Sequence, residues 1–335
     1  MMMRNQDIKA DLPDYVGGRE WILEDKELMP AYLRLYEQDA GIFQERCDKA
    51  LHLLENCRVC PRNCGVNRIK NEYGVCRSGR YAAVSSAFPH MGEEDGLRGW
   101  KGSGTIFFSF CNLKCVFCQN HELSWRGQGS QHNAGELARL MYSLQEQGCH
   151  NINFVTPEHV VPQLIEAIPL AIDMGLRIPI VYNTSAYDSM ESMELLDGIV
   201  DIYMPDFKFW DREKSRKYLG AEDYPDRARA VFKEMHRQVG PLRFDGNGLA
   251  KRGLLVRHLV MPGETQDSRH IFRFLARDLT PDTWVNIMDQ YHPEGMVLRK
   301  PEKYSQLNRG ISRKEYDDAC HAARDEGLYR FDTRG

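Results

Sequence analysis

From about residue 100 onward, short apolar segments alternate with helix-like segments, and this alternation limits the possible folds more than any other feature. We expect helices at 136–147 and 160–174, where apolar residues recur every three or four positions. We expect six strands, at 104–110, 151–156, 178–183, 198–204, 254–260 and 284–288. Strands that alternate with helices form parallel βαβ units, so the sequence predicts an α/β fold.

Three cysteines, spaced C-x3-C-x2-C, follow the first expected strand directly: Cys111, Cys115 and Cys118. Closed zinc sites need four protein ligands, and closed iron–sulfur sites usually have four cysteines. Three thiolates on a four-iron cluster would leave one iron open to an outside ligand. A zinc ion completed by a distant His is one alternative, and a disulfide with a spare thiol or three buried structural cysteines are others. The spacing favours an open, reactive iron–sulfur site.

The pattern C-x3-C-x-aromatic-C resembles the signature of the radical S-adenosylmethionine (SAM) superfamily. This resemblance implies a [4Fe–4S] cluster on the three cysteines, the amino and carboxylate groups of SAM on the fourth iron, and Phe117 near the adenine. It also implies that one electron from the reduced cluster cleaves SAM to methionine and a 5′-deoxyadenosyl radical, which abstracts hydrogen from a substrate. The implied fold is a partial (β/α)6 TIM-like barrel.

Each expected strand ends on polar residues, and parallel α/β barrels carry their functional residues at these C-terminal ends. Over residues 57–292 the chain is most similar to the pyruvate formate-lyase activating enzyme group. That similarity implies that Glu158 and Asp206 contact the SAM amino group, Lys208 its carboxylate, and His292 its ribose. For Thr156 and Ser185, the alternative role is to cap a helix or to lie in a solvated loop. The candidate cofactor-binding residues are Phe117, Thr156, Glu158, Asn183, Ser185, Asp206, Lys208 and His292.

A second group of cysteines precedes the barrel, spaced C-x2-C-x3-C-x11-C: Cys57, Cys60, Cys64 and Cys76. Four thiolates can close a tetrahedral site, so either Zn²⁺ or an auxiliary [4Fe–4S] cluster would satisfy them. The alternative is four surface thiols without a metal, which cytosolic proteins tend to avoid. Spacing alone does not decide which metal is bound.

The chain has 335 residues and a net charge of −4, which gives no reason to expect a nucleic acid or an anionic membrane as partner. No apolar run is long enough to span a bilayer, and the first residues lack the apolar stretch of an export signal. Ten cysteines without such a signal suggest metal binding in the reducing cytoplasm. We expect a helical extension with the four-cysteine metal site at 1–98, the barrel at 99–295 and a helical tail at 296–335.

We therefore expect a radical SAM enzyme that abstracts hydrogen from a peptide, a protein or a small molecule. Its electron donor would be a protein such as flavodoxin or ferredoxin. An activating enzyme that installs a glycyl radical on a partner enzyme is one alternative, and a non-catalytic metal-binding adaptor is another. Four residues have side chains that could face the substrate, although each is also plausible in packing: Tyr187, Tyr203, Arg257 and His258.

Overall fold

The computed structural model describes residues 12–332, and its central feature is a ten-stranded, mostly parallel sheet. The six expected strands are all present and run parallel to their neighbours in chain order. They are β2 (Ser103–Phe108), β4 (Ile152–Val155), β5 (Ile180–Thr184), β6 (Ile202–Pro205), β8 (Ala250–Leu259) and β9 (Trp284–Met288). The predicted α/β class is confirmed, and the sheet is consistent with a partial barrel. The first residues of the chain, which lack the apolar stretch of an export signal, lie outside the residues that the structure describes.

Four further strands extend this sheet, and the sequence did not predict them. They are β1 (Ala82–His90), β3 (Ser130–His132), β7 (Arg243–Phe244) and β10 (Arg330–Phe331). β1 runs antiparallel to β2 although it lies within the expected extension 1–98, so extension and barrel share one sheet. β3 pairs only with residues 82–84 of β1, which leaves one side of Pro89 unpaired. A proline is tolerated there because no neighbouring strand needs its missing N–H.

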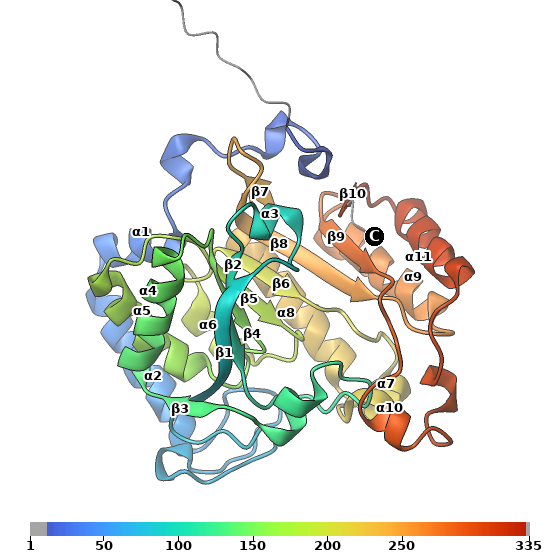
Figure 1. Cartoon of the computed structure of the whole chain (residues 1–335), viewed down its shortest axis with the longest axis horizontal. Coiled ribbons are helices and arrows are strands. Elements are labelled where there is room, and N and C mark those ends of the chain that lie inside the picture. The colour runs from blue at the N-terminus through green and yellow to red at the C-terminus, as the bar shows by residue number, and fades with distance from the viewer. Residues whose placement is uncertain (1–11, 333–335) are drawn as a thin grey trace, which may run out of the picture.

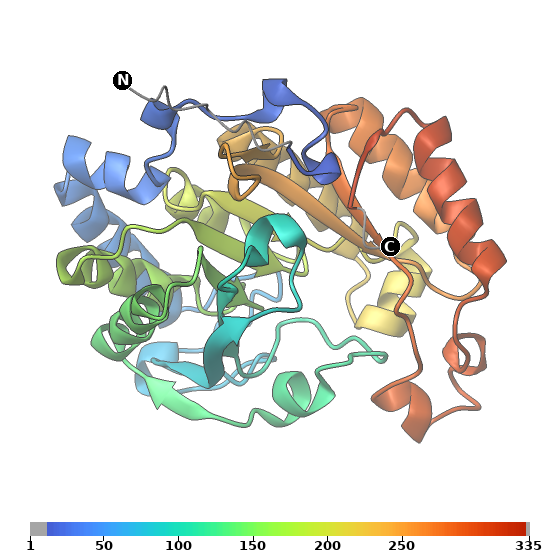
Figure 2. The same cartoon turned by 45° about the horizontal axis from the view of Figure 1, so that its top comes forward.

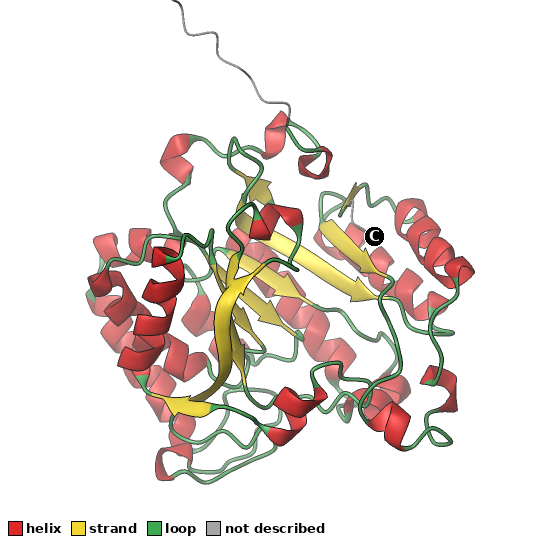
Figure 3. Ribbon diagram, in the orientation of Figure 1, coloured by secondary structure: helices red, strands yellow, loops and turns green. Residues whose placement is uncertain are grey.

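Helices cover the outside of the sheet, as Figure 3 shows. The longer ones are α1 (Ala31–Gln38), α2 (Gly41–Glu55), α4 (Ala134–Glu146), α5 (Val161–Met174), α6 (Met190–Leu196), α8 (Tyr224–Val239), α9 (Thr265–Phe274) and α11 (Arg313–Asp325). Helix α5 is apolar on most sides, and α4, α2 and α6 pack against it. Among residues 12–332, no helix is both long and apolar enough to cross a membrane.

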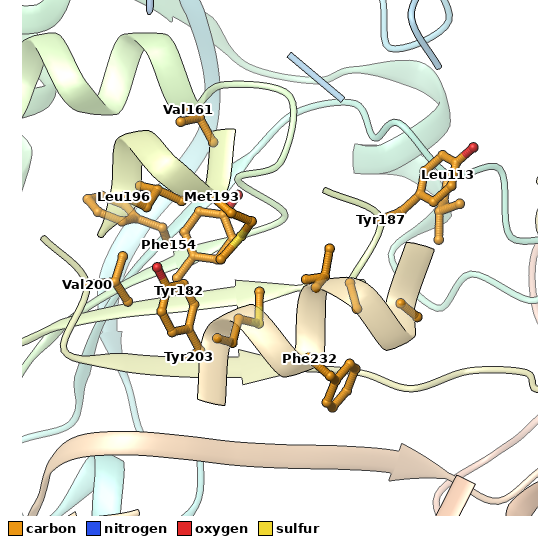
Figure 4. Close-up of a cluster of buried hydrophobic side chains, with 14 of the residues drawn as sticks. Leu113, Phe154, Val161, Tyr182, Tyr187, Met193, Leu196, Val200, Tyr203 and Phe232 are labelled. Carbon is orange, nitrogen blue, oxygen red and sulfur yellow. The ribbon is translucent and has the colours of Figure 1, made fainter. Parts of the chain in front are cut away.

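The core between the sheet and these helices is rich in aromatic side chains. Figure 4 shows Phe154, Tyr182 and Tyr203 packed beside Met193 and Leu196. Tyr182 donates to the buried Asp188 carboxylate at 2.7 Å, so its hydroxyl keeps a partner inside the core. Buried hydroxyls need such partners because desolvation without a hydrogen bond is costly. The core therefore fixes the C-terminal ends of β4, β5 and β6.

The inner face of the barrel is closed near the N-terminal ends of its strands. The short helix α3 (Asp95–Arg98), between β1 and β2, places Leu97 in one buried cluster with Val181, Ile202 and Leu255. The first described residues join this second core, and Figure 2 shows them (blue) on the opposite side of the molecule from α10 (Met296–Arg299). In Figure 1, β6 and β8 end on the side that carries α10 and α7 (Arg212–Lys214). The open end of the barrel is thus the C-terminal one.

Candidate active site

The loop after β2 carries the cysteine triplet at the open end of the barrel. The cysteine triplet is Cys111, Cys115 and Cys118. Its backbone is held from two sides: the Lys114 and Val116 amides donate to carbonyls at 219 and 218, and the Val116 carbonyl accepts from Met296. Burial raises the pKa of the Cys115 thiol to about 12, although the nearby Lys208 ammonium acts in the opposite direction. Metal binding deprotonates such thiols, so the triplet is a fixed set of soft ligands.

A cavity of about 580 Å³ opens beside the cysteine triplet. Besides all three cysteines, its wall contains six of the eight candidate cofactor residues: Phe117, Thr156, Asn183, Ser185, Asp206 and Lys208. These residues come from the ends of β2, β4, β5 and β6, which are adjacent in the sheet. Parallel strands bring their carboxyl ends to one edge, which explains how residues about a hundred positions apart meet here.

Asp206 and Lys208 form an ion pair on the cavity wall, with Nζ and Oδ2 2.6 Å apart. Burial disfavours the charged Lys208, but the Asp206 carboxylate and the Cys115 thiol outweigh it and raise the pKa of this lysine. The ammonium therefore stays protonated beside the triplet. A fixed ammonium and carboxylate, two positions apart in the sequence, match the opposite charges of an amino-acid zwitterion.

The strand ends next to this pair are held by unusual local conformations. Thr156 has φ of +59°, a left-handed conformation that β-branched residues rarely adopt, and its amide donates to the Asn183 carbonyl at 2.9 Å. Ser185 donates through its amide and its hydroxyl to Glu158 Oε1, at 2.5 and 2.6 Å. Local strain of this kind persists only where the surrounding structure enforces it. The turns after β4 and β5 are therefore positioned together.

Two candidate cofactor residues do not line the cavity. Glu158 is fully buried behind Ser185, and its Oε2 has no hydrogen-bond partner among the described residues. His292 is exposed, and its Nδ1 lies 3.4 Å from the Pro293 carbonyl oxygen. Glu158 thus contacts the wall through Ser185. Within residues 12–332, no hydrogen bond holds the His292 ring over the cavity.

A second part of the wall is a buried ionic network that the sequence did not predict. Arg257, on β8, donates to Glu94 at 2.7 Å and to Glu93 at 2.5 Å, and Asn286 donates to Glu94 at 2.8 Å. Burial opposes ionisation of Glu93, but Arg257 and His90 outweigh it and lower the pKa of this carboxyl to about 2. The only sign of this network in the sequence was the pair of adjacent acids, Glu93 and Glu94, after β1. Their partner Arg257 lies more than 160 residues further along the chain, so the sequence did not reveal the pairing. Of the four substrate-facing candidates, only Arg257 lines the cavity; Tyr187, Tyr203 and His258 are buried.

The second cysteine site lies next to the triplet loop. It consists of Cys57, Cys60, Cys64 and Cys76, of which only Cys64 is half-buried rather than buried. Burial raises the pKa of the Cys60 thiol to about 12, and the Cys76 and Cys57 thiols add to this, so the three are close together. A Cβ on Gly74 would lie 2.7 Å from the Cys64 sulfur, so only a glycine there lets Cys64 approach the chain leading to Cys76.

The residues at the open end of the barrel fit a cluster with SAM. Soft thiols, a zwitterion-matching ion pair and an aromatic wall meet in one cavity. As they stand, no three His, Cys, Asp or Glu side chains among residues 12–332 are arranged to hold a single metal ion. Cysteines of a [4Fe–4S] cluster each bind a different iron, so they surround a cluster instead of converging on one point.

The fold and the site are compatible with an iron–sulfur enzyme, and the comparison with known families identifies the class. The chain belongs to the radical SAM superfamily, whose family model matches residues 105–275. Membership implies a [4Fe–4S] cluster and SAM as cosubstrate, and it makes the protein an enzyme of SAM-dependent radical chemistry.

Among individual proteins, the chain is similar to an uncharacterized protein of Methanocaldococcus jannaschii, MJ0674. The two are 32% identical over 282 residues, which are 82% of this chain and 76% of that protein. Solved structures with a similar fold include SuiB of Streptococcus suis (14% identity, TM-score 0.42) and anSMEcpe with bound AdoMet (13%, TM-score 0.42). The matches cover 68% and 65% of this chain, and they span 47% and 57% of those two.

Proposed function

We propose that this protein reductively cleaves SAM and uses the resulting radical to abstract hydrogen from a substrate bound in the same cavity. The observation that carries this proposal is the shared wall: the cysteine triplet and the Asp206–Lys208 pair face one space of about 580 Å³. When bound, the cluster would supply one electron to the sulfonium of SAM. The residues of the chain bind and orient SAM, and they exclude water from the cavity.

Each wall residue has a distinct task in this proposal. Lys208 faces the SAM carboxylate and Asp206 the amino group, because each carries the opposite charge. Ser185 and Asn183 offer a hydroxyl and an amide to the same end of the molecule. Phe117 is buried edge-on against Phe209 and gives the adenine an apolar neighbour.

The direct test is product formation after anaerobic cluster reconstitution. With dithionite as reductant, the wild-type protein should convert SAM to 5′-deoxyadenosine and methionine. Cys115→Ala should abolish this product, because the cluster loses one of three anchors. Cys47→Ser, outside both cysteine sites, is the matched control and should retain it. Near-normal product from the Cys115 variant would refute the role of the triplet.

Within the superfamily, we propose that the chain is closest in function to the activating-enzyme group. Asn183, Asp206 and Lys208, which the similarity assigns to SAM, support this because they share the cavity wall. Installing a glycyl radical on a partner protein is one form of such activity. A persistent glycyl radical in the electron paramagnetic resonance (EPR) spectrum of the partner would support it, whereas a modified peptide or small molecule without such a radical would favour another substrate.

We further propose that the second cysteine site holds a metal–thiolate centre, zinc or a second [4Fe–4S] cluster; the cluster is favoured because no three of the described side chains converge on one metal position. The supporting observation is Arg68, which is 1% exposed and has no carboxylate partner among the described residues. Its Nη1 lies 4.0 Å from the Cys57 sulfur, and its Nη2 has no hydrogen-bond partner there. An unpaired buried cation is costly, and four metal-bound thiolates would supply the missing negative charge.

The proposed layout assigns this second centre to residues 1–98, radical chemistry to 99–295 and a covering tail to 296–335. A flavodoxin or ferredoxin would supply the electron. Oxygen-sensitive clusters and ten cysteines suit a reducing compartment, which supports the cytoplasm as the location.

A further inference from the structure

We propose that the second cysteine site is the electron entry site of this enzyme, and that the surface over it binds an acidic one-electron donor protein. This inference rests on the proposed metal centre and makes it a redox centre, which excludes zinc. Three independent features carry it: a side chain shared with the triplet, a rigid connection between the two loops, and a basic apolar surface.

A single side chain, Asn112, contacts cysteines of both sites. It is fully buried, and its Oδ1 lies 3.9 Å from the Cys111 sulfur. Its side chain also lies beside the Cys60 thiol, and its backbone carbonyl accepts from Arg62, two residues after Cys60. The Asn112 amide nitrogen donates to the Tyr187 carbonyl at 2.7 Å, which fixes its orientation. One amide group therefore separates a ligand of the reactive cluster from a ligand of the second centre, which is a short path for an electron.

The two loops are also clamped to each other. Arg62, between two cysteines of the second site, donates through Nε to the Asn112 carbonyl at 2.8 Å and lies over the Tyr187 ring at 5.2 Å. Lys114 lies within the triplet loop, near both the Cys111 and the Cys76 thiols. Neither cation has a carboxylate ion pair among residues 12–332. The Arg62 contacts hold the loop of the second site against the triplet loop, so the fold fixes the separation of the two sites.

The segment that carries the second site exposes a basic and apolar surface. This basic apolar surface consists of Arg58, Ile69, Lys70, Tyr73, Val75 and Arg77. The exposed charged residues of this segment are Arg58, Lys70 and Arg77 against Glu72, whereas the whole chain has a net charge of −4. Tyr73 is 57% exposed, far more than a packed aromatic residue. Transient electron-transfer contacts are small, and opposite charges steer the partners together, so the fitting partner is acidic.

The electron balance of the transfer is simple. The donor, a reduced flavodoxin or ferredoxin, loses one electron, and the second centre is reduced and then reoxidised as this electron passes to the triplet site. The electron is finally consumed when the sulfur–carbon bond of SAM breaks. No additional oxidant or reductant is required.

The first experiment asks whether the second centre is redox-active. The variant Cys111→Ala/Cys115→Ala/Cys118→Ala is reconstituted anaerobically, analysed for iron and zinc, and reduced for EPR spectroscopy. The expected result is about four iron atoms per chain and a reduced-cluster signal. Zinc in place of iron, or no bound metal, would overturn the inference while leaving SAM cleavage by the wild-type protein untouched.

The second experiment compares two reductants on the complete protein. Product is measured with dithionite, which is small enough to reduce the triplet site directly, and with reduced flavodoxin. In Cys64→Ser/Cys76→Ser the ratio of flavodoxin-driven to dithionite-driven product should collapse, whereas Cys47→Ser should keep the wild-type ratio. An unchanged ratio in the double variant would contradict the inference. No product from the wild-type protein with either reductant would instead defeat the proposed function itself.

A third measurement keeps the inference testable if the double variant misfolds. Reversing charge with Arg58→Glu/Lys70→Glu should weaken flavodoxin binding about tenfold at low salt, measured by titration calorimetry. Arg139→Glu, an exposed charge reversal on α4, is the control and should bind like the wild-type protein. Equal binding by the surface variant and the control would place the donor elsewhere.

Discussion

At the scale of single residues, the cavity depends on a few charges held where water is scarce. Lys208 keeps its proton because Asp206 lies 2.6 Å away and the Cys115 thiol is close. Such charge-assisted contacts contribute more than neutral hydrogen bonds. Asp206 and Lys208 were predictable as cavity residues because they directly follow a strand of the barrel. Glu158 shows the limit of that reasoning, because a strand-end position does not reveal that Ser185 stands between the carboxylate and the cavity.

Lys208→Ala should weaken SAM binding to the reconstituted protein. Loss of one charge-assisted contact costs about 1.5–3 kcal/mol, which corresponds to roughly ten- to hundredfold in Kd. Titration calorimetry without oxygen measures this directly. Lys208→Arg should recover part of the loss because it keeps the charge, and Lys303→Ala, an exposed lysine of the C-terminal region, serves as control. Unchanged SAM binding by Lys208→Ala would show that Lys208 does not contribute to the SAM site.

At the scale of elements, the strands and helices of the barrel follow from hydrophobic periodicity, because each is long and half-buried. β1 was missed since its sequence, with two serines and Pro89, lacks a strong strand pattern, and only pairing with β2 makes it a strand. That pairing brings Glu93 and Glu94, which follow β1, to Arg257 on β8. Local sequence carries no information about contacts over such distances.

Breaking this network should destabilise the fold. Arg257→Leu leaves two buried carboxylates without their cation, at a cost of about 3–5 kcal/mol in the free energy of unfolding. Urea denaturation at neutral pH measures the effect, with Arg139→Leu as the exposed control. A change below 1 kcal/mol would mean that water reaches the carboxylates.

The same network predicts how stability depends on pH. The folded-state pKa of Glu93 is lowered from 4.5 to about 2, so its contribution is present above the unfolded-state value and is lost as pH falls. The wild-type protein should therefore lose stability between about pH 4.5 and pH 2, relative to Glu93→Gln. Denaturation series at several pH values compare the two proteins. Parallel curves across this range would contradict the lowered pKa of Glu93.

At the scale of the whole molecule, the two cysteine sites are neighbours although Cys76 and Cys111 are 35 positions apart in the sequence. The sequence predicted each site separately, and only the packed structure shows that Asn112 lies between Cys60 and Cys111. The adaptor alternative is disfavoured by membership of an enzyme superfamily. The fold thus joins a reactive site and a proposed electron entry site in one rigid unit.

Metal loading of the second site should stabilise the whole chain. The buried Arg68 guanidinium has no anionic partner in the described part of the metal-free chain, so loaded protein should melt at a higher temperature than apoprotein. In Arg68→Met this difference should be smaller, because no cation then needs the thiolate charge. Calorimetry on matched loaded and apo samples tests this. An equal difference in both proteins would mean that Arg68 does not respond to the charge of the second site.

The most direct test of the central claim, that the triplet cluster and SAM share one cavity, is an EPR measurement on the reduced, reconstituted protein with and without SAM. Cys64→Ser/Cys76→Ser isolates the signal of the triplet cluster. The account predicts that SAM changes this signal, because its amino and carboxylate groups bind the open iron, and that Lys208→Ala requires more SAM for the same change. A spectrum unchanged at saturating SAM would contradict the account.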